Sequence, residues 1–193
     1  VLGCGTLRRT VQVRLRPSPR YRGTVARWHA HLHGLATAIH ETSGLAWRAN
    51  MKVIIGSDHA GFSMKSQVKT VLEDMGHSVE DVGCHSEDSV DYPVFGKAVA
   101  AGVARGEFPR GILVCGSGLG MSMIANRFVG VRAALCNDLY SAVLSRQHND
   151  ANLLVMGGRL IGADLAGEIV RTWLVTEFDG GRHQGRIAQL DEV

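Results

Sequence analysis

Three short segments of this chain are almost wholly apolar and end in glycine or small polar residues: MKVIIGSD (51–58), GILVCG (111–116) and LLVMGG (153–158). A strand without polar alternation is typical of a sheet that is covered on both faces. The segments between them carry apolar residues at near-helical spacing. This alternation of strands and helices predicts a parallel sheet sandwiched between helices.

Shorter strand-like segments at 77–83 and 131–136 bring the expected number of strands to five. Gly76 ends the first helical segment, as a C-terminal glycine should. The sequence therefore predicts an α/β, doubly wound (Rossmann-like) fold with a five-stranded parallel sheet and helices on both faces. The expected helices lie at 62–75, 93–106, 121–128, 139–149 and 163–178, before a polar tail that contains GGRHQGR (180–186).

Residues 1–50 differ in composition from the rest of the chain. They hold eight Arg, no Lys and one acidic residue, whereas residues 51–193 carry a net charge of −4 within a chain total of +3. We expect a poorly ordered or non-native Arg-rich extension at 1–50 and one domain at 51–193. We favour the interpretation that residues 1–50 have no evolved role, because Met51 directly precedes a strong strand. Two alternatives stay open: a targeting leader and an arm that binds polyanions.

Several classes of protein are disfavoured by composition. No apolar run approaches 18 residues, so no membrane span or membrane partner is expected. The four cysteines lack CxxC or zinc-like spacing, which argues against a metal site and for a reducing compartment. We therefore expect a cytoplasmic protein, with organelle targeting by 1–50 as the alternative. The mildly acidic domain gives no reason to expect nucleic-acid binding.

Ligands of such sheets bind at the carboxyl ends of the strands. Polar residues and glycines gather at these positions, in 57–59, 115–118, 137–138 and 157–159. Asp58 and His59, at the end of the first strand, are therefore candidate functional residues.

The loop CGSGLG (115–120) is the most informative of these. Its three glycines let the backbone turn sharply and approach a ligand, and N–H groups at the start of a helix favour an anion. A thiol at that place favours the thiolate, so Cys115 is a candidate base or nucleophile. The alternative is a buried strand residue before a tight turn. The spacing matches neither a dinucleotide fingerprint nor a P-loop.

Two clusters lie outside these loops. His148, in SRQHND, ends a helix, where it is either catalytic or a complement to the helix dipole. Arg182 and Arg186 are four residues apart and share a face if they are helical, where they can hold a phosphate or simply face solvent.

Taken together, the motifs resemble those of type B ribose-5-phosphate isomerases. SDHAGF, DYP, GILVCGSGLGMSMIANR, GVRAALC, SRQHND, GGR and GGRHQGR occur in that family's order over about residues 51–190, and residues 1–50 have no counterpart. Galactose-6-phosphate and allose-6-phosphate isomerases share the fold. The resemblance implies interconversion of ribose 5-phosphate and ribulose 5-phosphate through a cis-enediolate, with no metal and no organic cofactor.

The resemblance also implies roles for individual residues. Cys115 matches the base that moves a proton between C2 and C1, and Ser117 matches a hydroxyl that assists proton movement between the oxygens. His148 matches the residue that opens the furanose ring. Some members use a glutamate a few residues after the cysteine position, but 118–120 contains no acid, so the chain resembles the cysteine class.

The remaining matches concern substrate binding. Asp58, grouped here with the catalytic residues, and Asn149 match polar contacts to the sugar. Loop N–H groups around Gly116, Gly118 and Gly120 would stabilise the enediolate. The phosphate-binding set corresponds to His59, Arg159, Arg182 and Arg186.

The family is dimeric, with sites built from both subunits, so we expect a homodimer or a dimer of dimers with shared active sites. Two alternatives to the pentose phosphate reaction stay open. One is the same mechanism on allose 6-phosphate, galactose 6-phosphate or a tetrose phosphate. The other is a non-catalytic module that binds a phosphosugar.

Overall fold

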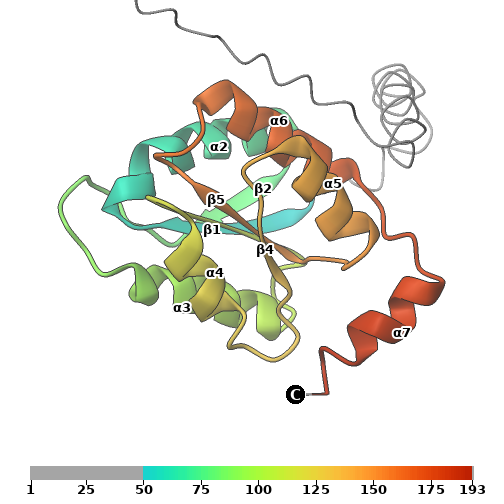
Figure 1. Ribbon diagram of the computed structural model, residues 1–193. Helices are drawn as coiled ribbons and strands as arrows, with labels where there is room; N and C mark the ends of the chain where they lie inside the picture. The colour runs from blue at the N-terminus through green and yellow to red at the C-terminus, as the bar shows by residue number, and fades with distance from the viewer. Residues whose placement is uncertain (1–49, 193) are drawn as a thin grey trace, which may run out of the picture. The chain divides into compact units, whose positions relative to one another are not determined.

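The sheet predicted from the sequence is present in the computed structural model, which describes residues 50–192. All of its strand pairs are parallel, and the strand order is β2-β1-β3-β5-β4 (Figure 1). The expectations for residues 1–49 lie outside the described residues. The strands are β1 (Lys52–Ser57), β2 (Ser78–Asp81), β3 (Arg110–Cys115), β4 (Ala133–Leu135) and β5 (Leu153–Gly157).

Helices cover both faces of the sheet, as the doubly wound prediction requires. The first group, α2 (Phe62–Asp74), α5 (Leu139–Gln147) and α6 (Ala163–Val175), packs on one face (Figure 1). The second group, α3 (Tyr92–Ala104) and α4 (Leu119–Ala125), packs on the other. A short 3₁₀ turn, η1 (His59–Gly61), links β1 to α2. Within residues 50–192, no helix combines the length and hydrophobicity that crossing a bilayer requires.

The central strands feed two apolar layers. Ile55, Val114 and Leu154 lie in the layer that contains the fully buried Trp173 of α6. Their neighbours Ile54, Leu113 and Val155 lie in the layer under α3 and α4. Successive residues on a strand point to opposite faces, so a sheet covered twice needs apolar side chains at every position.

The C-terminal segment differs from the expectation of a polar tail. Residues Arg182–Ala188 form a helix, α7, that follows two glycines with positive φ. Only His183 and Ile187 of α7 are buried. The only apolar residues of α7 are Ile187 and Ala188, which are adjacent, so they give no helical periodicity from which to predict a helix.

His77, in the turn between α2 and β2, is a buried base without a polar partner. Its side chain is 8% exposed, and neither ring nitrogen has a hydrogen-bond partner within the described part of the chain. Burial lowers the pKa of His77 below 6.5, because the protonated ring loses its hydration.

We predict that His77 makes the fold sensitive to acid. As pH falls below 6.5, the unfolded chain takes up this proton before the folded chain does. The free energy of unfolding should therefore be highest above that pH and fall by up to about 1.4 kcal/mol per pH unit until the folded pKa is reached. Urea unfolding from pH 5 to 8 should show a shallower pH dependence for His77→Gln than for the unchanged chain.

The control is His85→Gln, which removes an exposed histidine and should leave the slope unchanged. Equal slopes for all three chains would show that His77 is not the responsible group.

Candidate functional site

The loop after β3 folds around the Cys115 sulfur. Cys115 ends β3 and is 5% exposed, and the Gly118 N–H donates a hydrogen bond to its Sγ at 3.1 Å. Gly118 has φ +79, in the left-handed region, where a Cβ would also collide with the Leu135 side chain. A glycine is therefore required at the residue that turns its N–H back onto the thiol.

Ser117 lies between this sulfur and the start of α4. Its Oγ accepts a weak hydrogen bond from the Leu119 N–H at 3.4 Å. The first N–H groups of a helix have no acceptor inside the helix. In α4, which begins at Leu119, the Leu119 N–H makes only this long contact with Ser117, so it and the next N–H groups can turn to an oxyanion held in the 115–120 loop.

Asp58 and His59 follow the neighbouring strand β1 at the same edge of the sheet. The Asp58 N–H donates to the Val114 carbonyl at 3.3 Å, which holds Asp58 beside the end of β3. Its carboxylate accepts the Gly61 N–H at 3.0 Å. The His59 Nδ1 lies 3.2 Å from the Val90 N and 3.3 Å from the Val90 O. That contact fixes the ring and leaves Nε2 as the nitrogen that can meet a ligand.

Arg159 reaches the same loop from the end of β5. The backbone N–H of Arg159 donates to the Gly116 carbonyl at 3.0 Å. A Cβ built on Gly116 would lie 3.5 Å from the Arg159 Cδ, so the stem of this exposed arginine lies over that glycine. A cationic head group is thereby held near Cys115.

Tyr92 is a further candidate site residue, although the sequence analysis gave it no role. A Cβ on Gly120 would lie 2.6 Å from the Tyr92 Cζ, so the ring packs directly against the loop. Tyr92 is 38% exposed at the start of α3. Its position before Pro93, within the DYP motif, was the available signal.

His148 and Asn149 lie at the opposite edge of the sheet. His148 caps the C-terminus of α5, with its N–H bonded to the Leu144 carbonyl at 2.9 Å. Its half-buried ring stacks on that of His183, with centroids 4.3 Å apart and 5° between the planes. Asn149, the next residue, is exposed.

Arg182 and Arg186 form a second group of site residues with His148 and Asn149. Both are exposed on α7, while His183 and Ile187 are buried. The helical spacing considered for the two arginines is therefore present, and their charged heads leave the same side of a short helix.

The direction of the strands separates the two groups. Gly157, at the end of β5, pairs with Cys115, whereas α5 runs back so that His148 precedes the start of β5 at Leu153. Five residues of strand span roughly 16 Å. One chain therefore brings together Asp58, His59, Cys115, Gly116, Ser117, Gly118, Gly120 and Arg159 at the carboxyl edge. It collects His148, Asn149, Arg182 and Arg186 at the amino edge.

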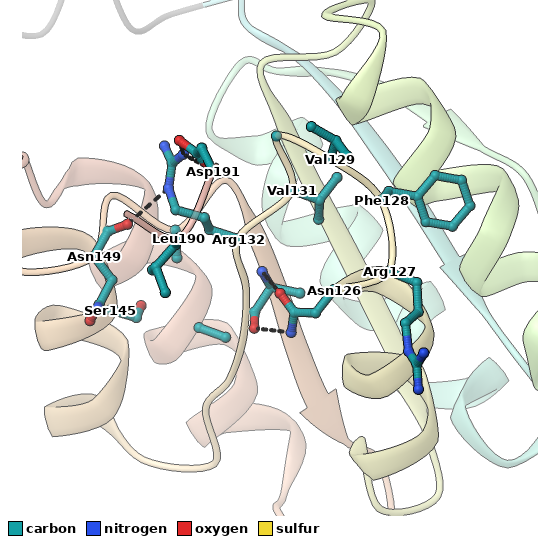
Figure 2. Close-up of a pocket in the computed structure, with 14 residues that line it drawn as sticks. Asn126, Arg127, Phe128, Val129, Val131, Arg132, Ser145, Asn149, Leu190 and Asp191 are labelled. Atoms are coloured by element: carbon teal, nitrogen blue, oxygen red, sulfur yellow. Dashed lines mark hydrogen bonds and ion pairs between the residues drawn. The ribbon is translucent and has the colours of Figure 1, made fainter. Parts of the chain in front are cut away.

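Arg132 joins Asn149 to the C-terminal tail, and the sequence did not single it out. Its Nε donates to the Asn149 carbonyl at 3.0 Å and its Nη1 pairs with Asp191 at 3.2 Å (Figure 2). Its Nη2 pairs with Asp150 at 3.2 Å. Arg132, Asn149 and Asp191 border a hollow of about 420 Å³ between the 126–134 segment and the C-terminal tail. The signal in the sequence was a lone charge at the head of an apolar strand, in GVRAALC.

Metal-ligating side chains do not cluster within residues 50–192. No three of the described His, Cys, Asp or Glu residues lie close enough together to hold a metal ion. The described thiols, Cys84, Cys115 and Cys136, are all free.

We predict that Gly118→Ala destabilises the chain by about 2–4 kcal/mol, because left-handed backbone strain adds to overpacking against Leu135. The matched control is Gly106→Ala, at φ +71 with open space around it, which should cost only about 1 kcal/mol. Urea unfolding of both variants measures the difference. Equal losses would show that the loop is not closely packed at Gly118.

Comparison with known proteins gives one consistent result. A family model described as Ribose/Galactose Isomerase matches residues 53–190. Ribose-5-phosphate isomerase B of Escherichia coli is 45% identical over 142 residues, which cover 74% of this chain and 95% of that protein. D-erythrulose-4-phosphate isomerase 2 of Mycolicibacterium smegmatis is 44% identical over 132 residues, which cover 67% of this chain and 87% of that protein.

A solved structure agrees with this result in three dimensions. The ribose 5-phosphate isomerase of Thermotoga maritima is 55% identical and superposes with a TM-score of 0.72, over 74% of this chain and 99% of that one. The family resemblance drawn from the seven motifs is confirmed. The chain belongs to the ribose/galactose isomerase family.

Proposed function

We propose that this chain interconverts ribose 5-phosphate and ribulose 5-phosphate through a cis-enediolate, without a metal or an organic cofactor. The observation that carries the proposal is the Cys115 thiol at the carboxyl edge of the sheet, within a loop whose Gly118 N–H already donates to the sulfur. An aldose–ketose isomerase needs a base beside donors for an oxyanion, and this loop supplies both.

The proton transfers follow from that arrangement. The Cys115 thiolate takes the proton from C2 of the open-chain aldose, and the electron pair forms the C1–C2 double bond while O1 becomes an oxyanion. The loop N–H groups stabilise this oxyanion. The Ser117 hydroxyl relays the O2 proton to O1, and the thiol returns its proton to C1, which leaves the carbonyl at C2.

Ring opening and phosphate binding require the second group of residues. His148 moves the proton that opens the furanose ring, and Asn149 and Asp58 bind sugar hydroxyls. His59, Arg159, Arg182 and Arg186 bind the phosphate. Anchoring the phosphate holds C2 against the base and converts remote binding energy into orientation.

The separation of the two groups within one chain supports a shared site. A second copy can present its amino-edge group to the carboxyl-edge group of the first, and a two-fold pair then builds two identical sites. We propose a homodimer of this kind, with pairing of dimers into a tetramer as a further level. We also propose a cytoplasmic enzyme with no nucleic-acid or membrane partner, in which residues 1–50 are dispensable for activity.

A second candidate substrate is a tetrose phosphate. It is favoured by the similarity to D-erythrulose-4-phosphate isomerase 2, which shares 44% identity. The catalytic loop treats C1 and C2 alike in either sugar, so the length of the site between that loop and the phosphate group decides. By the same reasoning, allose 6-phosphate and galactose 6-phosphate are alternative substrates with longer chains. A protein that binds a phosphosugar without catalysis is the alternative function.

The test is an initial-rate assay of the full-length chain in chelator-treated buffer. Ribose 5-phosphate is compared with erythrose 4-phosphate and allose 6-phosphate. We expect the highest kcat/KM for the pentose. A preference for either other sugar would keep the mechanism and change the substrate, and no turnover of any of them would favour the binding module.

We predict that Cys115→Ser lowers kcat by at least about 10³-fold while the fold is kept, because the base is lost from a preformed loop. The matched control is Cys136→Ala. Cys136 is also a buried thiol, but burial raises its pKa and it lies outside the loop, so this variant should keep kcat. Near-normal turnover by Cys115→Ser would overturn the assignment of the base.

A further inference from the structure

His183 is the one described residue whose ring is stacked face to face on His148. The rings are nearly parallel, and His183 is 8% exposed, so it is a fixed surface rather than a mobile side chain. Ile187, one turn further along α7, is also buried and anchors the same face of the helix. No part of the proposed chemistry uses His183 itself.

The segments on both sides of α7 are bonded to residues near His148. The Asp179 N–H donates to the Gln147 carbonyl at 3.0 Å, immediately before His148. Arg146, in the last turn of α5, donates from Nε to the Thr176 carbonyl at 3.3 Å. Beyond α7, Asp191 pairs with Arg132, which also holds the Asn149 carbonyl. The segment that contains α7 is therefore bonded, before and after the helix, to residues that neighbour His148 in the sequence or contact Asn149.

The stack joins two functions that are separate in sequence. Arg182 precedes His183 directly, and Arg186 is one turn away on the exposed side of α7. The position of His183 on the His148 ring therefore sets where the two arginines lie relative to that ring. In the proposed reaction, this is the separation between the phosphate and the ring oxygen of the sugar.

We propose that His183 is a positioning residue that holds the His148 ring, through face-to-face stacking, in the orientation for furanose ring opening. The inference rests on the proposed isomerase function. A flat platform restricts rotation of the His148 side chain and leaves the edge of the ring, where both nitrogens lie, open to the sugar. A misplacement of about 1 Å can cost about 100-fold in rate.

The charge of the His183 ring is compatible with stacking on His148. Burial lowers the pKa of His183, and the neighbouring His148, Arg182 and Arg186 act in the same direction, while Asp179 opposes them. A neutral ring stacks on His148 without repelling the proton that His148 must carry during ring opening.

The test uses two reactions of the full-length protein. Ribose 5-phosphate enters as a closed ring, so its isomerisation needs ring opening. Ribulose 5-phosphate is acyclic, because its 5-hydroxyl is esterified. Exchange of its C1 hydrogen with deuterium from D₂O therefore needs Cys115 and phosphate binding but not His148. NMR follows the exchange, and initial rates give kcat and KM for the aldose.

The variants are His183→Ala, His183→Phe and, as the matched control, Gln189→Ala, which removes an exposed side chain next to α7. We expect His183→Ala to lower kcat for ribose 5-phosphate by about 10- to 100-fold and to keep C1 exchange within about three-fold. His183→Phe, which restores a flat ring without nitrogens, should recover most of kcat, and the control should match the unchanged chain. If His183→Ala does not fold, His183→Leu replaces it, since it fills volume without a flat ring.

Three results would overturn the inference: an unchanged kcat for His183→Ala, an equal loss of both reactions, or no recovery with His183→Phe. An equal loss would indicate general damage to α7. The unchanged chain serves as the reference, because absence of both reactions in that chain would refute the proposed function and this inference with it.

Discussion

The parallel direction of the sheet is the constraint on which the rest of the structure depends. Each strand needs a helical crossover to return to the starting edge, so a residue at the end of a strand and a residue at the end of the following helix lie at opposite edges. Cys115 ends β3 and His148 caps α5, which places the proposed base and the proposed ring-opening residue apart in one chain. The proposed site therefore combines residues of two copies.

Hydrogen bonds and ion pairs within one chain hold the site residues in place at each edge of the sheet. At the carboxyl edge, Gly118 aims its N–H at the Cys115 sulfur, and Asp58 is bonded to the Val114 carbonyl. At the amino edge, the Arg132 guanidinium joins Asn149 to the C-terminal tail. Each edge is preorganised within its own chain, so the proposed pairing of two copies would bring together groups that need little further ordering.

The fold was predictable because the strong signals are local. Apolar strands such as 111–115, interrupted by helical segments, specify a doubly covered parallel sheet, and this prediction is confirmed. The α7 helix was missed because its stability comes from contacts with α5, such as the His148–His183 stack, rather than from its own composition. The roles of the site residues came from the family resemblance and stay predictions. The position of His148 across the sheet from Cys115 follows from the parallel topology alone, because the end of a strand and the end of a crossover helix lie at opposite edges.

The most direct test of the shared site is the activity of a mixed dimer. Cys115→Ser and His148→Asn subunits, each with a different affinity tag, are co-expressed and the heterodimer is purified through both tags. Each variant alone should be nearly inactive. The heterodimer should regain about half of the wild-type kcat, since one of its two sites combines an intact Cys115 with an intact His148. A heterodimer as inactive as its parents would contradict a site shared between copies.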